Sequence, residues 1–156
     1  MKKILSLLVL LAVFTSCEED VKFNTPAVQG LKDNDLWKAT EFTATVGTDN
    51  SLTIQATNGF ETLILKTSKT NARAYVLGVN EVDKASYSVA VDDLGLDYQT
   101  GTDLGSGEIK ITPQDTDLVA GYITGTFHFR AISDDGDEVF FQNGVFYKVP
   151  ITGVAQ

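Results

Sequence analysis

Apolar and polar residues alternate in the segment from Gly121 to Ile151. In its first half the apolar positions are Ile123, Phe127, Phe129 and Ala131, and the polar residues Thr124, Thr126, His128 and Arg130 fill the gaps. This period is typical of a β-strand with one buried face. An Asp135-Gly136 pair then precedes a second β-rich run, which predicts a hairpin. Because five of the nine Phe residues lie in this segment, we expect it to form the centre of the core.

The same alternation recurs upstream and predicts further short strands. They are expected at residues 37–39, 42–46, 52–57, 61–67, 74–78, 85–91 and 108–112, with turns at 47–50 and Asn58-Gly59, and residues 92–103 are expected to be irregular. Outside the N-terminal segment no window shows helical periodicity. Short strands with frequent turns predict an all-β fold, an antiparallel meander that forms a β-sandwich. A lipocalin-like barrel is the alternative, and it would differ by leaving an interior cavity.

The N-terminus has the pattern of a secretory signal peptide. Lys2 and Lys3 precede a run from Ile4 to Phe14 that is apolar except for Ser6. A basic start followed by a short apolar run is typical of such a signal. The run is shorter than the roughly 20 residues that a transmembrane helix needs. We therefore expect residues 1–16 to be a signal peptide that is removed.

The residues that follow, Phe14-Thr15-Ser16-Cys17, resemble the lipobox of bacterial lipoproteins, in which small residues precede an invariant cysteine. The resemblance implies that a diacylglyceryl group alkylates the Cys17 thiol, that the signal is cut before Cys17, and that the new amine receives a fatty acyl chain such as palmitate. Phe14 departs from the pattern, because Leu is commoner there. Several acyl chains would give stable anchoring. The alternative is an ordinary signal peptide with an unrelated cysteine.

The mature chain is long enough for one domain. Removal of residues 1–16 leaves 140 of the 156 residues, a length that suits a single domain. We expect residues 17–35 to be an acidic flexible tether and residues 36–156 to be a single all-β domain. Glu18-Glu19-Asp20 resembles the signal that sends many Bacteroidota lipoproteins to the outer leaflet, facing the medium, and a solvated tether is the alternative. Because Cys17 is the only cysteine, lipidation leaves no thiol for a disulfide or a thiolate metal site.

The chain is strongly acidic. It has 12 Lys and Arg against 21 Asp and Glu, a net charge of −9, and loss of Lys2 and Lys3 with the signal makes the charge −11. An acidic surface disfavours contact with nucleic acid and with anionic membranes. We therefore expect no nucleic-acid partner, and membrane association only through the lipid on Cys17.

Five short motifs follow one another along the domain. They are Trp37-x-Ala39, Tyr75-x-Leu77-Gly78, Gly107-x-Ile109-x-Ile111-Thr112, Gly125-Thr126-Phe127-x-Phe129-x-Ala131 and Asn143-Gly144-x-Phe146-x-x-Val149-x-Ile151. Together they resemble a family of small Bacteroidota lipoproteins catalogued as a domain of unknown function, and the resemblance covers nearly all of the mature domain. It implies an all-β fold and a location in the cell envelope, at the outer membrane on its periplasmic or surface face. It implies no activity.

Few residues could carry chemistry. His128 is the only histidine, and no motif places a nucleophile beside it, so we expect a surface or cross-strand role for it. One histidine and no thiol exclude most zinc and copper sites. The acids at 134–138 crowd one turn, whereas calcium needs six to eight oxygens, so we expect them to serve turn geometry and solubility unless other loops converge there. We expect that the protein is not an enzyme and that it binds no metal and no cofactor.

Adjacent aromatic residues leave an opening for binding. Phe140 and Phe141 are consecutive in a strand and must face opposite sides, and Phe146 and Tyr147 repeat this arrangement. One set fills the core, and the other is covered by a second layer, lines a groove or lies at an interface. Phe140, Phe141 and Tyr147 are therefore the candidate ligand or interface residues. We expect an anchored lipoprotein with a noncatalytic binding or structural role, toward a glycan, lipid or protein partner. The alternatives are a lipocalin-like carrier of a small apolar ligand and a glycan-binding module.

Overall fold

The computed structural model describes residues 25, 27–91 and 94–155, so the signal peptide, Cys17 and the acidic residues after it lie outside the described residues. The described chain forms eleven strands. They are β1 (Ala27–Lys32), β2 (Asp35–Lys38), β3 (Glu41–Gly47), β4 (Leu52–Asn58), β5 (Glu61–Thr67), β6 (Ala74–Leu77), β7 (Lys84–Val91), β8 (Leu94–Gln99), β9 (Ser106–Ile111), β10 (Tyr122–Ser133) and β11 (Glu138–Ala155). None of these residues belongs to a helix that could cross a bilayer.

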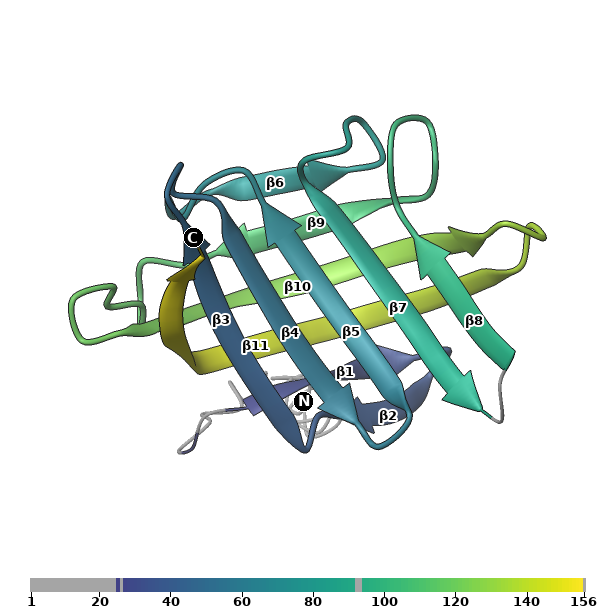
Figure 1. Cartoon of the computed structure of the whole chain (residues 1–156), viewed down its shortest axis with the longest axis horizontal. Coiled ribbons are helices and arrows are strands. Elements are labelled where there is room, and N and C mark those ends of the chain that lie inside the picture. The colour runs from purple at the N-terminus through teal and green to yellow at the C-terminus, as the bar shows by residue number, and fades with distance from the viewer. Residues whose placement is uncertain (1–24, 26, 92–93, 156) are drawn as a thin grey trace, which may run out of the picture.

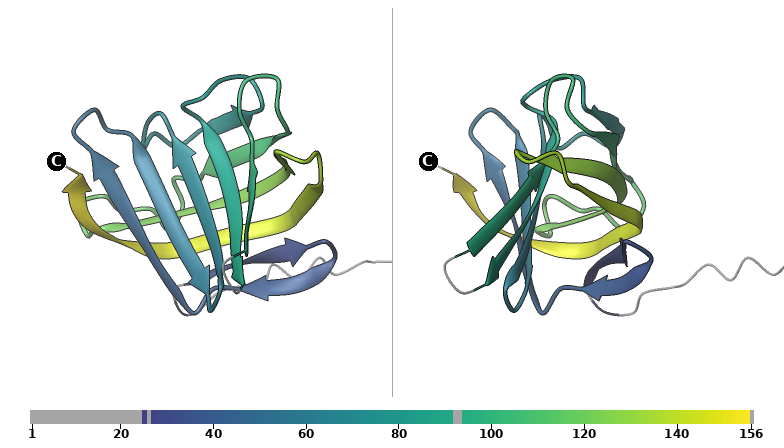
Figure 2. Two further views of the ribbon diagram at one scale, coloured as in Figure 1. Left: turned by 45° about the vertical axis from the view of Figure 1, so that its right-hand side comes forward. Right: turned by 90° about the vertical axis from the view of Figure 1, so that its right-hand side faces the viewer.

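The strands lie in two layers that pack face to face (Figure 1). β3, β4, β5, β7 and β8 form the front layer. β10 and β11 lie behind this layer and cross its strands at a large angle. β9 and β6 lie on one side of them, and β1 and β2 lie on the other. Figure 2 shows the same two layers from the side, with the β1–β2 hairpin at the edge of the back layer. The predicted all-β sandwich is confirmed.

Hydrogen bonding continues from one layer into the other, so the strands form one mixed sheet folded on itself. β11 pairs with β1 and β10 in the back layer and then, from Ile151 onward, with β3 in the front layer. At another corner Ile132 of β10 pairs with Gln99 of β8. The β11–β3 pairing is parallel, so the predicted antiparallel meander does not hold at this corner. β6 also leaves meander order, because it pairs with β9 at the edge of the back layer.

The predicted tether is wrong for residues 27–35, because the domain begins there. β1 pairs with β11 on one side and with β2 on the other. Val28 is 0 % exposed and belongs to the core. A register shift between Gln29 and Leu31 interrupts the alternation of β1, which explains why no period-two pattern is visible. The N-terminal part of the proposed tether lies outside the described residues.

The prediction that residues 92–103 are irregular is also wrong for residues 94–99, since they form β8. β8 pairs with β7 over its whole length, from Leu94 opposite Val91 to Gln99 opposite Ser86. The short alternation of Leu94, Leu96 and Tyr98 lies in a segment rich in glycine and acids, and Leu96 is half exposed. Backbone pairing with β7 therefore holds this strand more than burial does.

The core lies between the layers and centres on the β10–β11 hairpin, as predicted. The ring of Phe141 is 1 % exposed and stacks on Phe129 with ring centroids 4.9 Å apart. Tyr87 from the front layer and Trp37 from β2 meet the same ring at 5.3 and 5.7 Å in edge-to-face geometry, an arrangement that aromatic pairs prefer. Phe141 thus joins three parts of the chain that lie far apart in sequence.

Two glycines of this hairpin are paired with aromatic rings. Phe127 lies opposite Gly144, and Phe146 lies opposite Gly125. A Cβ placed on Gly144 would lie 2.5 Å from the Phe127 ring, and one on Gly125 would overlap the ring of Phe146. Each ring therefore covers the glycine of the other strand, which gives a physical reason for two of the motifs in the sequence.

The turn between β10 and β11 differs from the type I′ geometry that an Asp-Gly pair favours. Only Gly136 has a positive φ, of 89°, and Asp135 does not share it. The Gly136 N–H donates to the Ser133 carbonyl, and the Ser133 N–H donates to the Asp137 carbonyl. These bonds define a three-residue loop in which a type I turn is followed by a left-handed glycine.

Candidate functional site

A β-bulge in β11 shapes the outer face of the back layer. Phe127 opposes Gly144 and Phe129 opposes Phe141, so Gln142 and Asn143 together oppose His128. Asn143 takes a φ of 49°, a conformation that Asn adopts more readily than most residues. Gln142 and Asn143 are both exposed. The bulge therefore places two amide side chains next to the only histidine, as bulges near functional sites often re-aim side chains.

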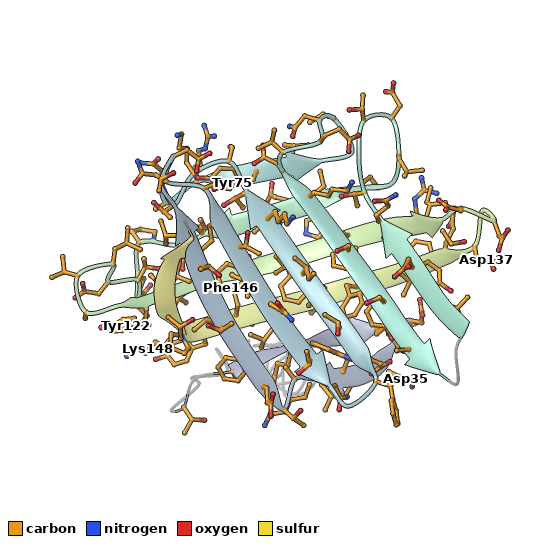
Figure 3. The ribbon with its side chains drawn as sticks, viewed as in Figure 1. Asp35, Tyr75, Tyr122, Asp137, Phe146 and Lys148 are labelled. Atoms are coloured by element: carbon orange, nitrogen blue, oxygen red, sulfur yellow. The ribbon has the colours of Figure 1, made fainter. Side chains whose placement is uncertain are left out.

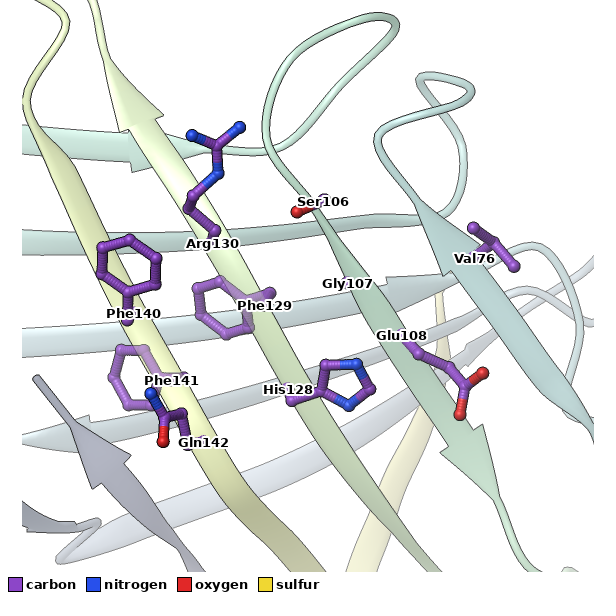
Figure 4. A pocket seen from close by; sticks show the side chains of 10 residues that line it. All are labelled: Val76, Ser106, Gly107, Glu108, His128, Phe129, Arg130, Phe140, Phe141 and Gln142. Carbon is purple, nitrogen blue, oxygen red and sulfur yellow. The ribbon is translucent and has the colours of Figure 1, made fainter. Parts of the chain in front are cut away.

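The bulge lies at the middle of a shallow trough on this face. One depression, of about 510 Å³, is lined by side chains of β6, β9, β10 and β11 that include Glu108, His128, Phe140 and Gln142 (Figure 4). A second depression, of about 550 Å³, shares His128 and Gln142 with the first and continues past Asn143. Both volumes are within the range of small-molecule sites, although both depressions are open to solvent.

The trough combines one aromatic ring with several hydrogen-bonding side chains. Phe140 is 38 % exposed. Beside it, Arg130 donates to Glu138 at 2.6 Å, which orients its guanidinium at the rim. Glu108 faces His128 across the β9–β10 pair. This surface can offer a flat apolar ring together with donors and acceptors, and its open shape does not exclude water.

The three candidate aromatic residues lie in different surroundings. Phe140 lines the trough. Phe141 is a core residue, so its ring is not available to a ligand on the surface, and its place among the candidates was wrong. Tyr147 does not line the first depression. It belongs to a second bulge in β11, where Tyr147 and Lys148 together oppose Thr124. The predicted opposition of Phe140 and Phe141 is confirmed, whereas the lipid-attachment residue Cys17 lies outside the described residues.

A second polar cluster, which the sequence did not indicate, lies at the seam between β1–β2 and the front layer. Lys32 donates to Glu61 at 2.6 Å and to the Tyr87 hydroxyl at 2.9 Å, and the Tyr87 hydroxyl donates to Glu61. The Trp37 indole donates to the other Glu61 oxygen at 2.8 Å. The four residues come from β1, β2, β5 and β7, and no sequence spacing links them.

The pKa values in this cluster reflect its hydrogen bonds. Burial opposes ionisation of Glu61, but the bonds from Lys32 and Tyr87 outweigh it and lower the Glu61 pKa. Burial likewise favours the neutral amine of Lys32, and its bonds to Glu61 and Tyr87 outweigh that effect and raise its pKa. Burial and the bond to Glu61 raise the pKa of Tyr87 to about 12. Because both Glu61 oxygens accept bonds from the protein, the cluster fastens the seam and leaves little capacity for a ligand.

The acidic turns of the described chain do not converge. No group of three or more His, Cys, Asp or Glu side chains with metal-binding geometry occurs among residues 25, 27–91 and 94–155. Asp134, Asp135 and Asp137 lie on the β10–β11 turn, and Asp115 and Asp117 lie on the loop before β10. Asp92 and Asp93 are outside the described residues.

Comparison with known proteins places the chain in a family and gives no activity. No curated protein and no solved structure matches it. One family model covers residues 24–150. This span includes β1 and β2, in agreement with a domain that begins before residue 36. The chain therefore belongs to the family described as Domain of unknown function (DUF6252).

Proposed function

We propose that this protein is a lipid-anchored, surface-exposed outer-membrane lipoprotein of a Bacteroidota cell envelope, with a noncatalytic binding role. The anchor rests on Lys2, Lys3, the apolar run to Phe14 and the lipobox-like residues before Cys17. The binding role rests on the trough across β9, β10 and β11.

The observation that carries the binding role is the contrast between a filled interior and a hollowed outer face. Aromatic and aliphatic side chains fill the space between the layers, which favours binding outside the sandwich over carriage of a ligand within it. On the outer face, Phe140 lies beside the polar side chains of His128 and Gln142. A sugar ring presents C–H groups on one face and hydroxyls at its edge, so an exposed ring bordered by donors and acceptors suits a glycan.

The anchor is tested by Cys17→Ser. The variant is expected to remain unprocessed or mislocalised and to incorporate no radiolabelled palmitate. A variant that still fractionates as a processed, palmitate-labelled membrane protein would show that Cys17 is not the attachment site.

The binding role is tested with the full-length protein and a panel of soluble polysaccharides, namely starch, dextran, xylan and galactan, in affinity electrophoresis. We expect retardation by at least one polysaccharide and its loss in Phe140→Ser. Phe60→Ser is the matched control, because Phe60 is 75 % exposed on the β4–β5 turn, away from the trough. Equal retardation of both variants, or none of the parent protein, would contradict glycan binding in the trough.

A further inference from the structure

The loop before β10 has an apolar tip. It joins β9 to β10, and its tip residues are Leu118, Val119 and Ala120. Val119 is 100 % exposed and Leu118 is about half exposed. Single exposed apolar residues are common on protein surfaces, so the tip becomes informative only through its surroundings.

Hydrogen bonds hold this tip in a defined shape. The Asp117 carboxylate accepts the N–H groups of Val119 and Ala120, each at 2.9 Å. The Asp117 carbonyl accepts the N–H groups of Gly121 and Tyr122, also at 2.9 Å. These four bonds satisfy the N–H groups of residues 119–122 from within the loop and hold the tip in one conformation.

The base of the loop carries two tyrosines and a lysine. The Lys148 amine lies 5.6 Å from the ring centre of Tyr122 and 5.4 Å from that of Tyr147. It also lies 3.6 Å from an Asp115 oxygen. The bond to Tyr147 raises the pKa of Lys148, so its amine is charged at neutral pH. Tyrosine and lysine beside an apolar tip are the residues that proteins place at a membrane–water interface.

The chain enters the domain at the same place. Ala27, the first residue of β1, pairs with Tyr147. Ala27 lies only ten positions after Cys17, a stretch of chain that spans at most about 33 Å when extended. A lipid on Cys17 would therefore keep this end of the sandwich close to the bilayer. Figure 3 shows Tyr122 and Lys148 at this end and Asp137 at the opposite end of the β10–β11 hairpin.

We infer that the tip formed by Leu118, Val119 and Ala120 docks into the lipid surface to which the protein is anchored, with Tyr122, Tyr147 and Lys148 at the level of the headgroups. This inference rests on the proposed lipid anchor. Contact through an apolar tip needs no positive surface, so it is compatible with the net charge of −11 that the chain carries once Lys2 and Lys3 are removed with the signal. It also fixes an orientation in which the hairpin turn at 134–137 points away from the membrane.

The test uses the lipidated full-length protein in phosphatidylcholine–phosphatidylethanolamine vesicles. Because Cys17 is the only native cysteine and its thiol is blocked by lipid, Val119→Cys provides a single site for a polarity-sensitive fluorophore. We expect its emission to shift to the blue and to be quenched by doxyl-labelled lipids. Asp137→Cys is the matched control and should show neither effect. A second change, Leu118→Asp, should abolish the quenching at position 119.

The outcomes separate the docking from the anchor. Protein that sediments with the vesicles but shows no quenching at position 119, or equal quenching at 119 and 137, would overturn the docking and leave the anchor standing. Protein that incorporates no lipid and stays in solution would overturn both. Quenching that vanishes in high salt would also contradict docking through an apolar tip, since salt screens charges and not apolar contacts.

Discussion

The two faces of the β10–β11 hairpin use the same residue type for different purposes. On the inner face, Phe127, Phe129, Phe141 and Phe146 are buried among one another and against the front layer. On the outer face, Phe140 is exposed beside His128 and Gln142. Phe140 and Phe141 are neighbours in the chain, yet only Phe141 is fully buried, so Phe141 contributes more to stability through burial. The comparison shows that strand alternation, and not residue type, decides which Phe of this hairpin is buried and which is exposed at the proposed binding surface.

The largest expected effect comes from the inner face. Phe141→Ala should lower the free energy of unfolding by about 3–5 kcal/mol, the usual cost of truncating a buried aromatic residue. That is a large share of the roughly 5–15 kcal/mol that stabilises a domain. Phe140→Ala should change it by less than about 1 kcal/mol. Urea denaturation of both variants measures the difference, and similar midpoints would remove the distinction between the faces.

A smaller effect is expected where a glycine makes room for the inner rings. Gly144→Ala would bring a Cβ to 2.5 Å from the Phe127 ring, and such overpacking costs about 1–3 kcal/mol. Gly153→Ala is the control, because a Cβ there would meet nothing within 4 Å. Combining Gly144→Ala with Phe127→Leu should cost less than the sum of the two single changes, since the shorter side chain relieves the overlap. Strict additivity in urea denaturation would contradict the pairing of ring and glycine.

Two ion pairs differ in exposure in the same way as the two faces of the hairpin. Lys32 and Glu61 are 27 % and 21 % exposed, whereas Arg130 and Glu138 in the outer face are 39 % and 38 % exposed. Glu61→Gln should cost about 1–3 kcal/mol at pH 7, because its hydrogen-bonded partners lose a charged acceptor. Glu138→Gln should cost less than about 1 kcal/mol, as is usual for an exposed pair.

The pH dependence of stability should report on the hydrogen bonds of Glu61. The pKa of Glu61 is lower in the folded state than its ordinary value of 4.5. Its contribution is therefore present above pH 4.5 and is lost as the pH falls through the folded pKa. In urea denaturation, the difference between the parent and Glu61→Gln should shrink below pH 4.5. Tyr87 should affect stability at alkaline pH, because its pKa is raised in the folded state. The stabilisation that its hydroxyl provides is lost as the pH rises from 10 toward about 12. A difference that stays constant over the acid range would contradict this account.

A modest effect is expected at the turn that joins the two strands. Gly136 has a φ of 89°, and a Cβ there would meet nothing within 4 Å. Gly136→Val should still cost about 1–2 kcal/mol, because a side chain disfavours this backbone region. Asp135→Val, at a position without positive φ, is the control and should cost less in thermal denaturation. Equal melting temperatures would show that the turn adapts its backbone.

The sequence predicts the fold wherever side-chain alternation follows the strand. In β10 the period-two pattern identifies Phe127 and Phe129 as buried and His128 as outward, and the structure agrees. Prediction failed at β1, where a register shift interrupts the alternation. It also failed at β8, whose short alternation of Leu94, Leu96 and Tyr98 lies among glycines and acids. These strands are held by backbone hydrogen bonds to neighbours, and such bonds leave little trace in residue type.

The candidate sites were less predictable for a related reason. Phe140 could be identified because its neighbour Phe141 must face the opposite side. The bulge that brings Gln142 and Asn143 opposite His128 depends on a register that no local signal sets. The Lys32–Glu61–Tyr87 cluster joins residues up to 55 positions apart, so only the tertiary fold brings them together.

The position of β11 also determines when the domain can be completed. β1, near the start of the chain, pairs with β11 through contacts such as Ala27 with Tyr147, 120 residues later. β3 likewise receives its parallel partner only from Ile151 onward. Such distant contacts make folding slow. A chain still emerging from the ribosome therefore lacks the strand that pairs with both β1 and β3, and this delay would favour the unfolded state that the proposed export across the inner membrane requires.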